Sequence, residues 1–181
     1  MPNRLTRLLK ELETSLIYLP VGNKMSGSVL IRGFKLRDLR QLRQLYLDLN
    51  PRGSLSLARF LWGIIGYRRL LICAEDTQTS SLVGLDLFYF NPRDLQESTV
   101  HEGFVGVVPS YRGKGLATKM RIIAKQHFHR NGLKGISTRI SQDNKASLIS
   151  ALNLGFEIVE TQHSVEDGEN HYMVCKLEES K

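Results

Sequence analysis

The sequence predicts an α/β (α+β) fold in which a mixed, mostly antiparallel central sheet is flanked by helices. Its 181 residues, 41% of them hydrophobic and 24% charged, fit one globular domain with a substantial core. Stretches with leucines at helical spacing come first, and three β-rich runs separated by polar turns follow. The last of these runs breaks at Pro109 into a glycine-rich turn, after which a helix starts.

An extra amphipathic helix is expected before this fold. One face of this helix carries leucines, and the opposite face carries charges of both signs. This mixture favours docking on the domain, or packing against a second copy in a homodimer, over binding to a membrane surface. Pro20 ends the helix, and 21–28 is expected to be a linker, so we divide the chain into 1–27 (helix and linker) and 28–181 (main domain). The leucines of the helix that share one face are Leu5, Leu8, Leu9, Leu12 and Leu16.

The main domain is expected to begin with a strand and two helices. The apolar run around Trp62 is interrupted by Arg59, Arg68 and two glycines, so we expect no membrane span. In chain order, the periodicity and turn residues predict a strand at 28–32, helices at 36–49 and 54–67, strands at 69–75, 82–91 and 99–108, a helix at 116–130, a strand at 136–140, a helix at 144–154, and strands at 156–162 and 171–177.

Composition limits the classes of ligand that the chain is expected to bind. The net charge is +7 and the pI is near 9.6, which suits a polyanionic ligand. The basic residues are scattered, so no nucleic acid is expected. Cys73 and Cys175 lie far apart in apolar runs, which predicts buried, reduced thiols in a cytoplasmic protein. There is no CxxC, and no pair of histidines four residues apart encloses a carboxylate, so no metal is expected.

The stretch from His101 to Ala124 predicts a phosphate site. Gly113 and Gly115 let the backbone approach a ligand, and the helix that starts there presents unpaired N–H groups. The helix dipole and neighbouring basic side chains favour an anion at this point. Neither GxGxxG nor GxxxxGK[ST] is present, so a Rossmann site and a P-loop are not supported.

The same stretch resembles the acetyl-CoA-binding motif of the GCN5-related N-acetyltransferase (GNAT) superfamily. That motif is Arg/Gln-x-x-Gly-x-Gly/Ala after a strand ending in Val-x-Pro, and here it stands as Val107-Val108-Pro109 followed by Arg112-Gly113-Lys114-Gly115-Leu116-Ala117. A second block is similar too: Asn144, then Gly155-Phe156. The resemblance covers about 28–177 and implies a GNAT-type sheet.

Acetyl-CoA as acyl donor follows from this resemblance. The strand before the turn would pair with the pantetheine arm, and the backbone of the turn would hold the pyrophosphate. Asn144 matches a pantetheine-binding residue of the family but equally suits a helix N-cap, and both roles stay open. The implied cofactor residues are Val105, Gly106, Val107, Arg112, Gly113, Lys114, Gly115, Leu116, Ala117, Thr118 and Asn144.

Acyl transfer to an amine requires a base, and two neighbouring residues are candidates. Glu102 is the nearest carboxylate, but the family position is Gly103. A one-residue shift turns a side chain to the other face of a strand, and a β-bulge would restore it. His101 has the opposite parity and titrates near neutral pH.

The general acid is a departure from the family. The tyrosine that many relatives carry is replaced here by Ala151. Ser147, Ser150 or water could substitute, or catalysis could be lost. The resemblance therefore implies an N-acetyltransferase for a primary amine of a small molecule or a protein, and its alternative is a non-catalytic acyl-CoA-binding regulatory module. A basic peripheral-membrane protein is the weaker third hypothesis.

The acceptor stays open. In the family it is bound by two loops, which here are 50–54 and 163–170. Arg52 in the first suits a carboxylate or phosphate on the acceptor. The second loop is acidic and would attract an amine; its carboxylates are Glu166, Asp167 and Glu169.

Overall fold

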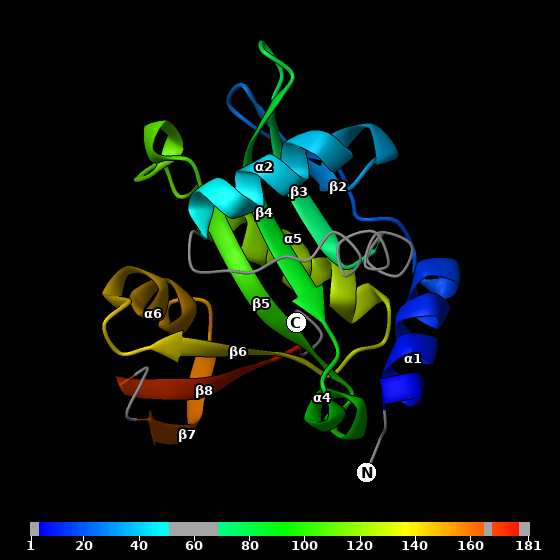
Figure 1. Ribbon diagram of the computed structural model, residues 1–181, viewed down its shortest axis with the longest axis vertical. Helices are drawn as coiled ribbons and strands as arrows, with labels where there is room; N and C mark the ends of the chain where they lie inside the picture. Colours follow the sequence, from blue (N-terminus) through cyan, green and yellow to red (C-terminus); the bar gives the residue numbers. More distant parts are fainter. Residues whose placement is uncertain (1–3, 51–68, 165–167, 178–181) are drawn as a thin grey trace.

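The computed structural model describes residues 4–50, 69–164 and 168–177 (Figure 1). The predicted helix at 54–67, Arg52, Glu166 and Asp167 lie outside these residues. The elements are α1 (Arg4–Ile17), β1 (Lys24–Ser26), β2 (Val29–Gly33), the 3-10 helix η1 (Leu36–Asp38), α2 (Leu39–Leu49), β3 (Leu71–Asp76), β4 (Ser81–Tyr89), α4 (Pro92–Glu97), β5 (Thr99–Val107), η2 (Pro109–Tyr111), α5 (Leu116–Arg130), β6 (Gly135–Ser141), α6 (Lys145–Leu152), β7 (Phe156–Ser164) and β8 (Gly168–Lys176).

The strands form one sheet in the order β1-β2-β3-β4-β5-β6-β8-β7. The β5–β6 pair is parallel, and the other neighbouring pairs are antiparallel. Helix α2 lies on one face of the sheet and α5 on the other (Figure 1). The prediction of a mixed, mostly antiparallel sheet flanked by helices is confirmed.

The first four residues of β3, Leu71 to Ala74, are all apolar because both faces of the strand are covered. Leu71 and Cys73 belong to the core under α2, whereas Ile72 and Ala74 belong to the core under α5. Because both faces are covered, the strand cannot alternate between apolar and polar residues. Burial also raises the pKa of the Cys73 thiol to about 12, so the thiol stays protonated.

The N-terminal region corrects one prediction. The helix α1 is present, but the expected linker contains β1, which pairs with β2. Gly27, at φ +62°, makes the tight turn between the two strands. A run of three residues, two of them with exposed side chains, is too short for a period-2 pattern to predict a strand.

Those leucines of α1 whose side chains the structure describes are exposed and do not dock on the sheet. Leu5 is 62% exposed and Leu16 is 84% exposed. The helix is instead fixed at its C-terminal end, where Thr14 and Tyr18 are buried and the Leu19 N–H donates to Asn131 Oδ1 at 2.7 Å. Packing of this face against a second copy stays a prediction.

The short helix α4 replaces the turn that the sequence predicted between the second and third β-rich runs. The Asn91 side chain accepts from the N–H groups of Arg93 and Asp94, and the Asp94 carboxylate accepts from the Asn91 N–H. Pro92 stands in the first turn. This reciprocal cap with an early proline is a known start of a helix, and the sequence Asn-Pro-x-Asp contained it.

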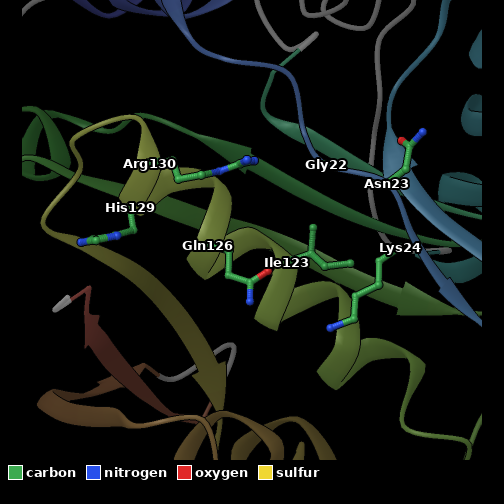
Figure 2. Close-up of a pocket in the computed structure, with 7 residues that line it drawn as sticks. All are labelled: Gly22, Asn23, Lys24, Ile123, Gln126, His129 and Arg130. Carbon is green, nitrogen blue, oxygen red and sulfur yellow. The ribbon is translucent and has the colours of Figure 1, made fainter. Parts of the chain in front are cut away.

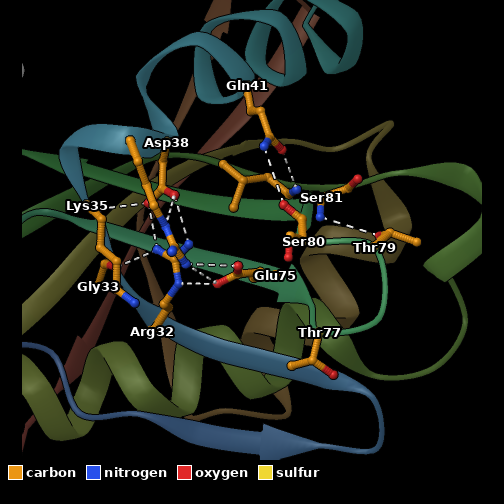
Figure 3. A network of polar contacts seen from close by, with 12 residues as sticks. Arg32, Gly33, Lys35, Asp38, Gln41, Glu75, Thr77, Thr79, Ser80 and Ser81 are labelled. Atoms are coloured by element: carbon orange, nitrogen blue, oxygen red, sulfur yellow. Dashed lines mark hydrogen bonds and ion pairs between the residues drawn. The ribbon is translucent and has the colours of Figure 1, made fainter.

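Buried ion pairs fix the start of α2 to the sheet. Arg32 on β2 donates to Asp38 of η1 at 2.6 and 2.8 Å and to Glu75 on β3 at 2.6 Å (Figure 3). The exposed Arg37 also reaches Glu75, at 3.1 Å. Arg32 thus joins η1, which follows β2 closely in the sequence, to β3, which lies much further along the chain, and the three elements are held together.

Candidate functional site

Strands β5 and β6 separate in the middle of the sheet. Their pairing runs from Thr99 opposite Gly135 to Glu102 opposite Thr138. Beyond that point β5 continues to Val107 and β6 to Ser141, and the two strands diverge (Figure 1). The second half of β5 therefore has β4 on one side and, among the described residues, no paired strand on the other.

The main chain of β5 faces this opening at alternate residues. The Val108 N–H donates to Val83 O at 2.9 Å, toward β4. By the alternation of an antiparallel ladder, the N–H and C=O groups of Val107 and Val105 point the other way. The Val107 carbonyl already accepts from Arg112 Nε at 3.0 Å. The polar main-chain edge thus lies where the sequence predicted it, with Arg112 attached to it.

Gly106 is required by packing. A Cβ there would lie 2.7 Å from Phe104 Cζ and 3.0 Å from Leu49 Cδ1. Such distances are below those of ordinary van der Waals contact, so any side chain would displace Phe104. The small size of Gly106 therefore leaves room for Phe104 and Leu49 to pack over β5 on the α2 side.

The glycine-rich turn joins this edge to α5. Gly113 has φ +73° and Gly115 has φ +69°, and an added Cβ at either position would meet nothing within 4 Å. The backbone conformation, and not crowding, is what requires glycine. Gly115 is the N-cap of α5 and no side chain caps the helix there, so the first helical turn starts with N–H groups that have no partner within the helix.

The surroundings of the turn hold it in place. Tyr111 donates to Asp76 Oδ2 at 2.5 Å, and this bond lowers the pKa of Asp76. The Lys114 ammonium lies 5.0 Å from the Tyr111 ring centroid. Leu116 is buried in the core, whereas Thr118 Oγ1 lies 3.2 Å from Ser150 Oγ on α6. The turn is thus rigidly supported on both sides and carries basic side chains on its exposed surface.

Asn144 caps α6. Its side chain accepts from the Ser147 N–H at 3.3 Å, and its own N–H donates to Ser141 O at 2.9 Å. Of the two roles that stayed open in the sequence, the structure contains the cap. A contact with a ligand stays a prediction.

Strand β5 has the bulge that the sequence argument required. Leu87 is paired with Phe104 and Phe88 with Glu102, so Gly103 is the extra residue. A Cβ on Gly103 would lie 2.3 Å from Tyr89 Cε1, so only glycine fits. The bulge lies at the point where β5 leaves β6.

Glu102 nevertheless does not present a free carboxylate. It is buried, and its two oxygens accept from Arg121 Nε at 2.8 Å and Arg121 Nη2 at 2.7 Å. Thr138 Oγ1 lies at 3.3 Å. We expected the bulge to direct Glu102 toward the reacting atoms, but in the structure the side chain points to α5.

Asp86 is a second carboxylate in this region. It is fully buried, and neither oxygen has a hydrogen-bond partner in the described part of the chain. Burial raises its pKa well above the ordinary value, the nearby Glu102 raises it further, and Arg121 opposes both. Burial and the charge of Glu102 thus favour the protonated form of Asp86 beside the Arg121–Glu102 pair.

His101 lies on the other face of β5. Its Nδ1 is 2.7 Å from Ser137 Oγ, and its ring lies 5.0 Å from the Tyr89 ring and 6.4 Å from the parallel Tyr172 ring. Burial lowers its pKa, although Asp94 and Glu102 act in the opposite direction. The imidazole is therefore neutral at neutral pH, in the form that accepts a proton.

This geometry agrees with the comparison of the chain with known families. Residues 36–156 match the family described as "Acetyltransferase (GNAT) family". The chain belongs to this family.

Individual relatives are more distant. The chain is 32% identical over 94 residues to mycothiol acetyltransferase from Mycobacteroides abscessus, an alignment that covers 51% of this chain and 31% of that protein, so it spans about a third of the relative's length. The yncA structure from Salmonella typhimurium, with its cofactor acetyl-CoA, has a TM-score of 0.71 at 21% identity, covering 85% of this chain and 96% of the other. The NatC complex bound to Gag peptide and CoA has a TM-score of 0.72 at 18% identity, covering 83% and 99%. At these identities the two structures support the GNAT fold alone.

Neither serine that the sequence offered in place of the family's general acid has a hydroxyl without a partner. Ala151 is fully buried. Ser147 Oγ accepts from Arg121 Nη2 at 3.1 Å, and Ser150 Oγ is paired with Thr118. Both candidate hydroxyls are thus already hydrogen-bonded within the protein.

The structure describes only parts of the two loops that are predicted to bind the acceptor. Asn50 ends α2, and the rest of the first loop lies outside the described residues. In the second loop, Glu169 lies 3.5 Å from His163 Nδ1 and 3.7 Å from His171 Nε2. The Glu169 carboxylate therefore lies close to two histidines.

A separate cavity of about 310 Å³ lies beside the C-terminal half of α5, at the other end of the helix from the glycine turn (Figure 2). Its lining residues are Gly22, Asn23, Lys24, Ile123, Gln126, His129 and Arg130.

Within 4–50, 69–164 and 168–177, no group of three or more His, Cys, Asp or Glu side chains is placed to hold a metal ion. Over the same ranges no helix has the length and apolar character to cross a membrane.

Proposed function

We propose that this chain is an acetyl-CoA-dependent N-acetyltransferase that acts on a primary amine of a small molecule or a protein. The observation that carries the proposal is the opening between β5 and β6, which leads directly to the glycine turn at the start of α5. An unpaired strand edge followed by free N–H groups suits an elongated ligand that ends in a pyrophosphate. Coenzyme A has this shape, and it is present in the related structures named above.

The residues present fit that ligand. The main chain of Val105 and Val107 would pair with the pantetheine arm, and the N–H groups of 113–118 would hold the pyrophosphate, with Arg112 and Lys114 beside it. The absence of neighbours around Gly113 and Gly115 leaves room for such an approach. When bound, acetyl-CoA supplies an acetyl thioester whose C–S bond breaks as the amine nitrogen forms the new C–N bond, and the sulfur leaves as the thiol.

His101 is the base in this proposal. Its neutral ring accepts one proton from the acceptor ammonium, and the second proton that the nitrogen loses goes to the departing sulfur. Glu102 is the second candidate, but a carboxylate whose two oxygens bind a buried guanidinium is a poor proton acceptor. We place the reaction in the cytoplasm, where the buried thiols Cys73 and Cys175 stay reduced.

The alternative is an acyl-CoA-binding regulatory module without catalysis. The specific observation in its favour is that Ala151 replaces the tyrosine of the family, while Ser147 and Ser150 are both hydrogen-bonded elsewhere. Release of free thiol from acetyl-CoA with a panel of amines separates the two proposals. We expect thiol release, and His101→Gln should reduce it roughly 10²–10⁴-fold.

Binding is tested with two matched glycine variants. Gly115→Val and Gly132→Val both place a β-branched residue at positive φ with no neighbour within 4 Å, at opposite ends of α5. Both should lower the melting temperature. Acetyl-CoA should raise the melting temperature of the wild type and of Gly132→Val, but not that of Gly115→Val. An equal ligand-induced increase in Gly115→Val would show that the turn is not the site.

A further inference from the structure

Three buried residues around His101 come from elements that the sequence did not connect with it. Ser137 Oγ on β6 lies 2.7 Å from His101 Nδ1 and donates to Asp94 Oδ1 of α4, also at 2.7 Å. Asp94 and Ser137 are both fully buried. Tyr172 on β8 covers the other side of the ring. The candidate base therefore stands at the end of a buried chain of hydrogen bonds.

The Asp94 carboxylate is held by three donors. Its Oδ1 accepts from Ser137 Oγ and from Thr99 Oγ1 at 2.7 Å, and its Oδ2 accepts from the Asn91 N–H at 3.1 Å. The last bond is part of the cap that starts α4. Helix α4 thereby fixes a carboxylate against β5 and β6.

The direction of the protons follows from the chemistry of the groups. An ionised carboxylate only accepts hydrogen bonds, so the single hydroxyl proton of Ser137 goes to Asp94. Ser137 Oγ is then left as an acceptor toward His101, and His101 Nδ1 must carry the ring proton. In a neutral imidazole the other nitrogen, Nε2, is then free of a proton.

We propose that Asp94 and Ser137 are positioning residues that hold His101 in the Nδ1–H tautomer, so that Nε2 takes the proton of the acceptor amine. The inference rests on the proposed function. When Nε2 is protonated, the imidazolium charge is balanced through Ser137 by the Asp94 carboxylate. The atoms balance: one amine proton moves to Nε2, and the hydrogen bonds from Nδ1 to Ser137 and from Ser137 to Asp94 keep their direction.

The other groups around the ring are accounted for. Glu102 is the next residue on β5, Tyr89 comes from β4, Arg139 from β6 and Tyr172 from β8. The charge of Glu102 acts with Asp94 in favour of the imidazolium, and Arg139 acts against it. Arg93 of α4 lies over the Tyr172 ring at 4.2 Å and does not form part of the chain to Asp94. Asp94 is therefore the carboxylate that is linked to the ring by hydrogen bonds.

The first test is the tautomer itself, measured without turnover. Ring ¹⁵N chemical shifts of labelled protein at pH 8, with His101 assigned by comparison with His101→Gln, should show a protonated Nδ1 and a bare Nε2. Ser137→Ala should lose this preference. A wild-type ring with the proton on Nε2 overturns the inference.

The second test is the pH profile of turnover. Asp94→Asn keeps the shape and removes the charge, so the acidic limb should move to lower pH and kcat should fall about tenfold or more, with the KM for acetyl-CoA unchanged. Ser137→Ala should behave in the same way. Glu97→Gln is the control, since it removes an exposed carboxylate from the same helix and should leave the limb in place.

The outcomes separate this inference from the proposed function. If Asp94→Asn and Ser137→Ala keep both the wild-type kcat and the wild-type limb, the positioning role is wrong even though acetyl transfer stands. If the wild type has the Nδ1–H tautomer but releases no thiol with any amine, the proposed function is wrong and the hydrogen-bonded chain stands. An unchanged melting-temperature increase with acetyl-CoA shows in each variant that the fold is intact.

Discussion

Two buried clusters in this protein combine the same groups with different results. In one, Arg32 lies between Asp38 and Glu75 (Figure 3). In the other, Arg121 faces Glu102 and Asp86. Each cluster places one almost fully buried guanidinium against two buried carboxylates. They differ in how many of the carboxylate oxygens have partners.

In the Arg32 cluster both carboxylates have a cationic partner, whereas in the Arg121 cluster only Glu102 is hydrogen-bonded to the guanidinium. Arg37 supplies a second cation to Glu75, so both carboxylates of the first cluster are paired. In the second, Arg121 is bonded to Glu102, and Asp86 is left without a hydrogen bond from any described residue. The raised pKa of Asp86 favours a bound proton in place of the missing cation, since isolated buried charges are costly. The first cluster fastens α2 to the sheet, whereas the second lies where β5 and β6 separate.

The largest effect is expected for Arg32→Met. The substitution leaves two buried carboxylates with only the exposed Arg37 nearby, so the free energy of unfolding should fall by about 3–5 kcal/mol in urea titrations at pH 7. Arg37→Met is the control and should cost less than about 1 kcal/mol, because that side chain is 64% exposed. Equal losses in the two variants would contradict a cluster centred on Arg32.

The sequence predicted the local features around these clusters better than the clusters themselves. The glycines of the turn and the bulge in β5 follow from motifs within one segment. The pairing of Glu102 with Arg121 depends on which face of β5 meets α5. Arg121 stands four residues after Ala117 and three before Ala124, on the face where α5 is buried, and this position could have indicated an internal arginine.

The partners of His101 were beyond the sequence for a related reason. Ser137 and His101 are opposite each other in a parallel pair, and the register of two strands so far apart is not encoded locally. Asp94 reaches them through a helix of six residues that looked like a turn. Sequence reasoning therefore found the candidate base but not the groups that orient it.

An intermediate effect is expected for Glu102→Gln. Loss of the charge-assisted bonds to Arg121 should cost about 1–3 kcal/mol at pH 7. Asp86 then becomes the remaining carboxylate beside Arg121, and its pKa should fall because the repulsion from Glu102 is gone. A ¹³C NMR titration of the Asp86 carboxyl carbon measures this shift. An Asp86 pKa that is the same in this variant as in the wild type would show that Glu102 does not raise it and that the two carboxylates do not share one cation.

The smallest change, when stabilities are compared near pH 4, is expected for Asp86→Asn, since Asp86 has no hydrogen bond to lose among the described residues. Its informative readout is the pH dependence. The pKa of Asp86 is raised in the folded state, whereas the unfolded chain titrates near 3.8. Above pH 3.8 the folded state thus binds one proton more than the unfolded state, and stability falls as pH rises until the folded pKa is passed.

Asp86→Asn should remove this slope, which amounts to at most about 1.4 kcal/mol per pH unit for one proton. Urea titrations from pH 4 to 8 should therefore give a flatter stability curve for the variant than for the wild type, with the two approaching each other near pH 4. If Asp86→Asn keeps the wild-type slope, Asp86 is ionised in the folded protein, and the two clusters differ in geometry but not in charge.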